Sequence, residues 1–368
     1  MWSPDADLAF PAGCLRPRPP EWLVATALAG RASGHCRCWI STAIVSCCRQ
    51  GIGLCDLGWR RDQESTRAFG KSYETATGTS ILFDGTGPTE GAIRTLVDSG
   101  DVTWDICDAD GFTALRLGAT GHLSAIDYKT VDPAKIMPPF AFTHGAGGYA
   151  YSYVLAFDTE RFAGRPPLSW KDFFDTRSFP GGRAVYRWMN GAFEAAMMAG
   201  SDKPTNPYPI DINLAVNRLY KLKPQLQTWE SGQQVQQMFV DKTISMACIW
   251  HTRAVALAKE SEGKIAFTWA GGVLHPGVWV VPKGNPGGID AFKLIGHMQD
   301  PARQIEFTNL QRVGPVNPAA TAAMPKALRD YDPTQPENLA QQVIVDSQWW
   351  ADNFDKARAE FADMLQRS

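Results

Sequence analysis

Three short motifs between Trp229 and Gly284 carry side chains suited to holding a small solute. They read Trp229-Glu-Ser-Gly-Gln, Met246-Ala-Cys-Ile-Trp-His-Thr-Arg253 and Trp279-Val-Val-Pro-Lys-Gly284. An indole ring offers a flat, rigid apolar surface and one N–H donor, which suits it to clasp an amine or an amphipathic molecule. No obvious nucleophile and base stand beside these rings. The region therefore predicts a binding cleft and not a reaction centre.

The elements around these motifs alternate between helix and strand patterns from Gln63 onward. This order predicts an α/β fold with mainly parallel sheets and helices on both faces. Ligands in open α/β sheets lie beyond the carboxyl ends of strands, so we expect the site at Asp108-Ala-Asp110, at Trp250-His251 and in the loop before Trp279. The expected helices cover 64–77, 89–98, 192–199, 211–222, 233–240 and 252–260, and the expected strands 80–83, 102–107, 149–157, 244–250 and 265–269. Gly78 and Gly100 are expected to end the first two helices.

Size and composition restrict the class of protein. A chain of 368 residues exceeds the length of a usual single core, so we expect two lobes or domains. A hydrophobic share of 44% and a net charge of −2 are ordinary for a soluble protein and give no basic field for nucleic acid. No apolar run approaches the roughly 20 residues that span a bilayer. We expect neither an integral membrane protein nor a nucleic-acid-binding one.

The first 58 residues differ from the remaining chain. They hold five arginines, no lysine and six of the eight cysteines, without a sustained helix or strand period. The run Trp22–Ala29 after Arg16 and Arg18 is similar to the apolar part of a signal peptide. We interpret residues 1–58 as an irregular export sequence or as the product of a wrong start or reading frame. Intact-mass analysis of the protein from its native host tests both interpretations. Residues 1–55 in the mature protein would count against both.

Enzyme and metal chemistry find little support. None of Ser65, Ser152 and Ser231 lies in G-x-S-x-G, and no phosphate-binding glycine loop or His-x-x-x-His pair occurs. The early cysteines lack zinc-site spacing, while Cys107 and Cys248 have apolar neighbours typical of buried thiols. We therefore predict no enzyme activity, no metal and no cofactor. Asp108 and Asp110, without a third carboxylate close by, are a weak candidate for a metal-binding loop.

A set of motifs from Trp59 to the C-terminus resembles one family. The set comprises Asp101–Asp105, Gly118–Asp127, Tyr151–Phe157, Trp229–Gln236, Trp250–Arg253, Trp279–Gly284 and Gly314–Asn317. It is similar to the extracellular solute-binding proteins of the spermidine/putrescine type, which serve ABC transporters. The resemblance implies a two-lobed periplasmic binding protein fold of type II, whose strands cross twice between lobes that close on the ligand.

The resemblance also implies boundaries, location and partners. Lobe 1 would be 59–158 plus 278–319, and lobe 2 would be 159–277 plus 320–368. The protein would be an exported, periplasmic monomer that delivers its solute to a membrane permease of an ABC transporter. The main reading is capture of a polyamine or polyamine-like amine for import. A ligand-sensing receptor module would use the same cleft and differ only in its docking surface.

Four positions carry over from the family as ligand contacts. Trp59 stands where the family has an early aromatic residue, Asp110 and Phe112 where it has contacts from the first lobe, and Trp250 where a tryptophan stacks on the ligand chain. Trp229, His251 and Trp279 join them as expected ligand-binding residues in the same motifs. Each tryptophan also has a core interpretation, and a hydrogen-bonded structural role is the more usual one for His251 and His275.

The acids that hold polyamine ammonium groups in the family are replaced here. Their places fall at Trp188 or Gly191, at Arg253 and at Gly277. An ammonium group buried without an anion is strongly disfavoured, and an arginine facing it adds repulsion. The alternative function is therefore binding of a zwitterionic or anionic solute, such as an opine-like amino-acid conjugate. In that version Asp108 and Asp110 would hold the amine and Arg253 the anion, unless Arg253 pairs with Glu194 or Glu230.

Overall fold

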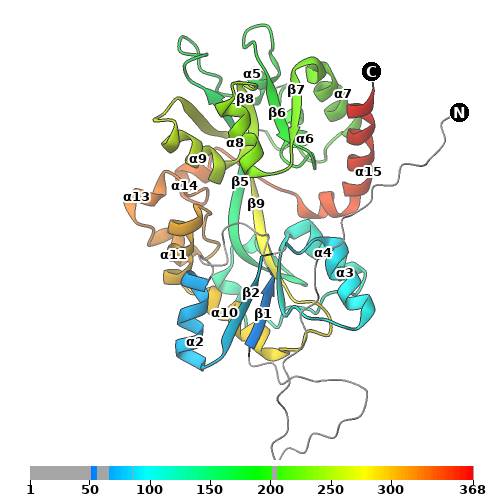
Figure 1. Ribbon diagram of the computed structural model, residues 1–368, viewed down its shortest axis with the longest axis vertical. Coiled ribbons are helices and arrows are strands. Elements are labelled where there is room, and N and C mark those ends of the chain that lie inside the picture. The colour runs from blue at the N-terminus through cyan, green and yellow to red at the C-terminus, as the bar shows by residue number, and fades with distance from the viewer. Residues whose placement is uncertain (1–50, 56–65, 86, 201–204, 368) are drawn as a thin grey trace, which may run out of the picture. The chain divides into compact units, whose positions relative to one another are not determined.

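Two long antiparallel strands, β5 (Gly145–Asp158) and β9 (Ile265–Val280), form the centre of the sheet in the computed structural model. The structure describes residues 51–55, 66–85, 87–200 and 205–367. Figure 1 shows β5 and β9 running side by side between a lower and an upper group of elements. Each long strand therefore contributes residues to both groups.

The described strands form one sheet in the order β2-β1-β3-β9-β5-β8-β6-β7. The pairs β1–β2, β1–β3, β6–β7 and β6–β8 are parallel, as expected, whereas the long strands pair antiparallel with each other, with β3 and with β8. Short strands β4 and β10 pair with β5 and β9. The bounds are β1 Gly51–Cys55, β2 Ser80–Asp84, β3 Ile106–Asp110, β4 Ala141–Phe142, β6 Arg183–Tyr186, β7 Leu226–Trp229, β8 Met246–Trp250 and β10 Val343–Ile344.

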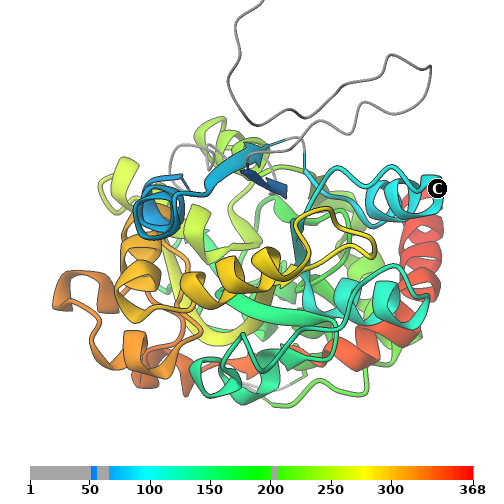
Figure 2. The ribbon, with the colours of Figure 1, turned by 90° about the horizontal axis from the view of Figure 1, so that it is seen from below.

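The lower group places helices on both faces of its strands because successive strand residues point to opposite sides. Val278 and Val280 of β9 pack in one cluster with residues of α3 and α4, while Trp279 packs in another with residues of α10. Seen from below, helices lie on both sides of these strands (Figure 2). The helices are η1 Thr66–Gly70, α2 Lys71–Thr77, α3 Glu90–Ser99, α4 Gly111–Ala119, α10 Ile289–Met298 and α11 Pro301–Gln311.

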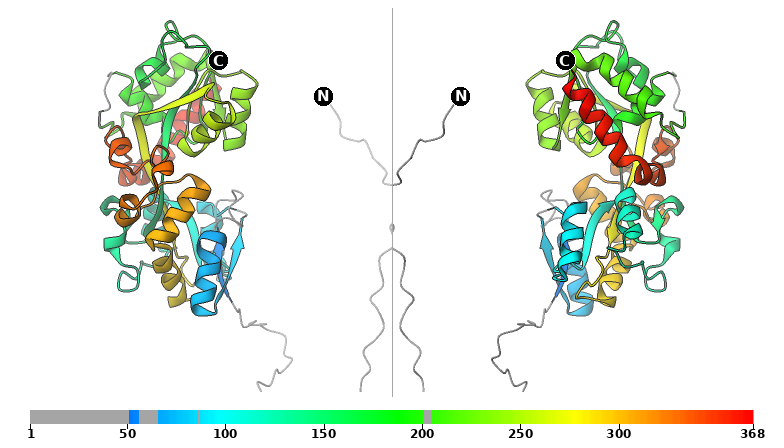
Figure 3. Two further views of the ribbon diagram at one scale, coloured as in Figure 1. Left: turned by 90° about the vertical axis from the view of Figure 1, so that its left-hand side faces the viewer. Right: turned by 90° about the vertical axis from the view of Figure 1, so that its right-hand side faces the viewer.

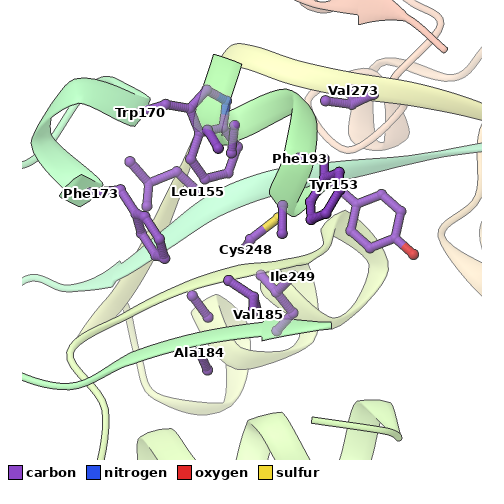
Figure 4. Packing of buried hydrophobic residues seen from close by; sticks show 14 of the residues in the cluster. Tyr153, Leu155, Trp170, Phe173, Ala184, Val185, Phe193, Cys248, Ile249 and Val273 are labelled. Carbon is purple, nitrogen blue, oxygen red and sulfur yellow. The ribbon is translucent and has the colours of Figure 1, made fainter. Parts of the chain in front are cut away.

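The upper group has its own core around the strands β5, β6 and β8. Figure 4 shows Leu155, Val185 and Ile249 from these strands packed with aromatic residues of the neighbouring helices. The long C-terminal helix α15 (Ser347–Gln366) runs along this group (Figure 3) and buries Trp350 in the same cluster. The other helices are α5 Trp170–Phe174, α6 Ala192–Met198, α7 Ile212–Leu222, α8 Gly232–Val240 and α9 His251–Glu260.

Short helices connect these elements. Three are single 3-10 turns at Pro133–Lys135, Pro138–Phe140 and Lys223–Gln225. Three more, α12 Pro318–Ala322, α13 Lys326–Arg329 and α14 Pro336–Leu339, lead from α11 towards β10 and α15. Among the described helices, none combines the length and the apolar character needed to cross a bilayer.

Several sequence expectations need correction at element boundaries. Residues 51–55 fall in the segment interpreted as irregular, yet they form β1, pair with β2 and β3, and bury Ile52 and Leu54. Strand β9 extends far beyond the expected 265–269, since its glycines and proline lie within the strand. The helix ends expected at Gly78 and Gly100 are confirmed, because both glycines adopt the left-handed conformation that ends α2 and α3. The lobe boundaries stay a prediction.

Candidate functional site

Three of the expected site residues lie at the carboxyl ends of strands, and Tyr186, which was not expected, ends a fourth strand. Strand β3 ends at Asp110, β6 at Tyr186, β7 at Trp229 and β8 at Trp250. The expected strand 102–107 is wrong, because β3 runs from Ile106 to Asp110 and takes both aspartates into the strand. Three tyrosines of β5, at positions 149, 151 and 153, approach these ends through the ring and hydroxyl contacts described below. This strand-end cluster is the candidate site.

The carboxylate-bearing residue Asp110 of this cluster is partly accessible to solvent. Its Oδ1 accepts a hydrogen bond of 2.6 Å from the Tyr151 hydroxyl, and its side chain makes no capping bond to α4 although it holds the N-cap position. Burial raises the pKa of Asp110 to about 6, although the Tyr151 hydrogen bond favours the charged form and opposes this shift. At neutral pH most Asp110 side chains are therefore ionised, at an energetic cost that a bound cation would relieve.

Asp108 has a different environment. It is fully buried, and both of its carboxylate oxygens accept from the Tyr149 hydroxyl, at 3.0 and 2.9 Å. The expected pairing of Asp108 with the amine of a solute is therefore not supported by its position, since Tyr149 and the core of the lower group cover it. Asp110 remains the better placed of the two acids.

Four aromatic rings stack around the ends of β6, β7 and β8. The ring centroids of Tyr186 lie 4.5 Å from Trp229 and 5.2 Å from Trp250, and Trp229 meets Trp250 edge-on at 4.8 Å. Tyr153 joins them at 6.1 Å from Tyr186. Trp229 is fully buried and donates its indole N–H to the Cys248 carbonyl at 3.0 Å, so it supports the other rings. Trp250 and Tyr186 keep partial exposure and are the rings available as walls.

Two buried histidines of the region differ in their partners. Nδ1 of His251 accepts from the Ser152 main-chain N–H at 3.0 Å, which leaves the proton on Nε2 to donate to the Arg312 carbonyl at 2.7 Å. Burial lowers the pKa of His251 to about 4. With both nitrogens bonded to the main chain, His251 has a structural role, contrary to its expected role as a ligand. His275 makes ring contacts with Tyr151 and Tyr153 instead.

The other expected contacts fall in several environments. Phe112 packs on α15, with its ring stacked 5.1 Å from Phe354, and Trp279 is buried edge-on against Tyr149 at 6.1 Å. Both therefore belong to the cores behind the site. Arg253 lies in the first turn of α9, three residues beyond Trp250, with its side chain against Gly232. Trp59 lies outside the described residues.

Two glycines explain why acids are missing from places where the family resemblance expected them. A Cβ atom at Gly277 would fall on the ring of Tyr149, and one at Gly191 would fall on the ring of Tyr153. Gly191 also has a φ of 76°, which disfavours any other residue. Tyrosine rings thus occupy the space that acidic side chains would need.

Sequence reasoning did not include the tyrosines among the site residues, and it placed His275 near the cleft only as a structural histidine. The alternation Tyr149, Tyr151, Tyr153 was a usable signal, because residues two apart in a strand share one face. His275 is the register partner of Tyr151 on β9, a pairing that the expected short strand excluded. In the part of the chain that the structure describes, no group of three or more metal-binding side chains occurs.

Comparison with known proteins places the chain in a family. Residues 68–332 match the family described as "Bacterial extracellular solute-binding protein". This chain belongs to the family of bacterial extracellular solute-binding proteins. The fold expected from the sequence, the two-lobed periplasmic binding protein fold, is confirmed by the similar solved structures. Solute binding, and not an enzymatic reaction, is what this family does.

Three individual proteins illustrate the similarity. The chain is 29% identical over 318 residues to a gamma-aminobutyric acid-binding protein of Pseudomonas aeruginosa, covering 85% of this chain and 90% of that one. An ABC transporter substrate-binding protein from Bradyrhizobium japonicum shares 29% identity with a TM-score of 0.81, over 86% of this chain and 100% of that one. The GABA receptor Atu4243 shares 26% identity with a TM-score of 0.80, over 86% and 98%. None of these three is named for a polyamine, so the polyamine type stays a prediction.

Proposed function

We propose that the protein captures a small zwitterionic solute, with a primary ammonium group at one end and a carboxylate at the other, for delivery to the permease of an ABC transporter. A γ-amino acid such as GABA is the simplest member of this class. The proposal places capture in the periplasm or at the cell surface. The observation that carries it is Asp110, which among the described residues is the accessible carboxylate of the strand-end cluster, beside aromatic walls.

The charge of the cluster favours one ammonium group. Asp110 supplies one negative charge, and Asp108 is already covered by Tyr149. Gly191 and Gly277 leave no room for further acids, since tyrosine rings lie over both. Among the described residues of the cluster, the second ammonium group of a diamine would therefore find no counter-charge, which is costly in a buried site.

Arg253 supports the second half of the proposal. It follows Trp250 by three residues, so it lies one turn along α9 from a ring of the site. A guanidinium group binds carboxylates with two parallel hydrogen bonds. The names of two similar proteins, which refer to GABA, agree with a solute of this charge pattern.

The polyamine reading keeps one observation in its favour. Glu194 of α6 is fully buried, and its Oε1 accepts from the Trp350 indole at 2.7 Å and the Tyr208 hydroxyl at 2.5 Å. Its Oε2 has no hydrogen-bond partner among the described residues. Burial raises the pKa of Glu194, which favours the neutral acid and weakens its case as a second ammonium site.

A thermal-shift screen of the full chain tests this proposal. The full chain is needed because a fragment that begins at residue 59 would lack β1. The panel holds GABA, other amino acids, opine-like conjugates, putrescine and spermidine. A ligand at 100 times its dissociation constant stabilises the folded state by about 2.7 kcal/mol. We expect shifts with zwitterions alone; a shift with putrescine that is lost in Glu194→Gln would support the polyamine reading instead.

A further inference from the structure

His275 has a buried ring nitrogen that makes no hydrogen bond to the described residues. The side chain is 1% exposed, and in the part of the chain that the structure describes its Nε2 has no hydrogen-bond partner. A buried polar atom without a partner costs free energy, so this nitrogen is available to a partner from outside the described residues, such as a solute. His251, the neighbouring buried histidine, has both nitrogens satisfied by main-chain groups.

The ring of His275 lies beside the Asp110–Tyr151 pair. His275 and Tyr151 face each other as register partners of β9 and β5, with ring centroids 5.3 Å apart and planes inclined by 28°. Tyr151 in turn donates its hydroxyl hydrogen to Asp110 at 2.6 Å. Tyr153 closes the other side of His275, edge-on at 5.2 Å. The imidazole is thus held by two tyrosine rings next to the carboxylate of the site.

Each of the three side chains offers a hydrogen-bond acceptor. Burial lowers the pKa of His275 to about 3, so the ring is neutral and one of its nitrogens carries a free lone pair. The Tyr151 oxygen donates to Asp110 and keeps lone pairs of its own. The Asp110 carboxylate has lone pairs beyond the one that accepts from Tyr151. A primary ammonium group has three N–H donors and needs three acceptors.

We propose that Asp110, Tyr151 and His275 form the seat of the solute's ammonium group, and that this seat selects primary ammonium groups over methylated ones. Nε2 of His275 accepts one N–H in the tautomer that carries the ring proton on Nδ1. The inference rests on the proposed function, because it assumes a zwitterionic solute. It adds that the protein distinguishes solutes by their ammonium group.

The consequence is a graded preference among methylated analogues. Each methyl group on nitrogen removes one N–H donor and leaves one buried acceptor without a partner. A site built to bind an N–H group rejects analogues that lack it far more strongly than a site that only fits their shape. We expect about tenfold weaker binding for the N-methyl analogue of GABA and at least about 100-fold weaker binding for the N,N,N-trimethyl analogue.

Isothermal titration calorimetry of the full chain with GABA and these two analogues tests the seat. His275→Phe retains a ring to stack on Tyr151 and removes the acceptor; we expect about tenfold weaker GABA binding. The same variant should bind the N-methyl analogue almost as well as the native protein does. His275→Gln restores an acceptor oxygen and should recover part of the GABA affinity. His122→Phe is the matched control, because this partly buried histidine lies outside the cluster and bonds to Thr120 and Asp98; it should change neither affinity.

The outcomes separate the seat from the proposed function. If neither GABA nor its analogues bind while another class of solute does, the proposed function fails. If all three bind with equal affinity, the proposed function stands and the seat is wrong. Equal weakening of GABA and its analogues in His275→Phe, with a lower melting temperature of the solute-free protein, would show a structural histidine and also overturn the seat.

Discussion

Lowering the pH from 8 to 5 should weaken solute binding through one group, Asp110. The pKa of this carboxyl is about 6 because burial penalises its charged form. An ammonium group is bound by the ionised carboxylate, whose population falls from nearly all molecules at pH 8 to about one in ten at pH 5. Apparent affinity scales with the population of the competent form, so the dissociation constant should rise about tenfold.

Other groups of the site stay constant over this range. The pKa values of His251 and His275 are about 4 and about 3, and burial raises the pKa of Tyr151 and of Tyr153 well above neutral pH. The ammonium group of the solute stays charged. The titration between pH 8 and pH 5 therefore reports on Asp110.

Calorimetric titrations with GABA at half-unit pH steps measure this effect, with Asp110→Asn as the control. The variant does not titrate, so it should bind weakly and with little pH dependence. A dissociation constant of the native protein that is flat from pH 8 to pH 5 would refute the reasoning. So would an unchanged pH profile in Asp110→Asn.

Lowering the pH should stabilise the solute-free protein through Asp110, whereas it weakens solute binding through the same group. Its folded-state pKa of about 6 lies above the ordinary value of 3.8, so the folded state holds the proton more tightly than the unfolded state. The contribution of this group to stability is fully present below pH 3.8 and is lost as the pH rises through 6. Comparing urea unfolding of the native protein with that of Asp110→Asn from pH 5 to pH 7 isolates this contribution.

Three further substitutions test the assignments around the site. Trp250→Ala should weaken solute binding by about 2 kcal/mol in calorimetry through loss of a wall, while circular dichroism shows the fold intact; a collapsed fold would assign Trp250 to the core. Gly277→Ala should destabilise the protein by about 1–3 kcal/mol in urea unfolding, because its methyl group displaces the Tyr149 ring. Gly91→Ala, in an open helical position, is the control and should be neutral or stabilising by up to about 1 kcal/mol. His251→Phe should cost about 2–4 kcal/mol in the same assay, because it leaves two buried main-chain groups without partners; unchanged stability would contradict its structural role.

Local signals predicted α2, α3 and α6 to α9, whereas α4, α10 and α11 were not among the expected helices. Gly78 and Gly100 end α2 and α3 as expected. A helix that ends in the left-handed conformation favours glycine at that position, and the glycine can be read directly from the sequence. The long strand β9 was cut short because Gly271, Gly272 and Pro276 indicate breaks within any isolated segment. Pairing with β5 over almost its full length keeps the strand extended, and such tertiary support is not visible in local sequence.

The site was predicted in outline and not in detail. Asp110 and Trp250 come from strand ends, which the alternation of elements predicts. Asp108 lies inside β3, and His251 begins α9 directly after β8. Tyr149 binds Asp108, and the main chain of Ser152 and Arg312 binds His251; such partners depend on the packing of distant segments. Sequence reasoning therefore identified the region and could not separate the residues that face a solute from those that support them.

Direct titration of the full chain with GABA and with putrescine, at pH 7.5 and equal ionic strength, tests the central claim. The account predicts micromolar or tighter binding of GABA, whose two ends match Asp110 and Arg253, and no measurable heat with putrescine. Binding of putrescine with micromolar or tighter affinity, in the absence of GABA binding, would contradict a zwitterion-binding site and restore the polyamine reading.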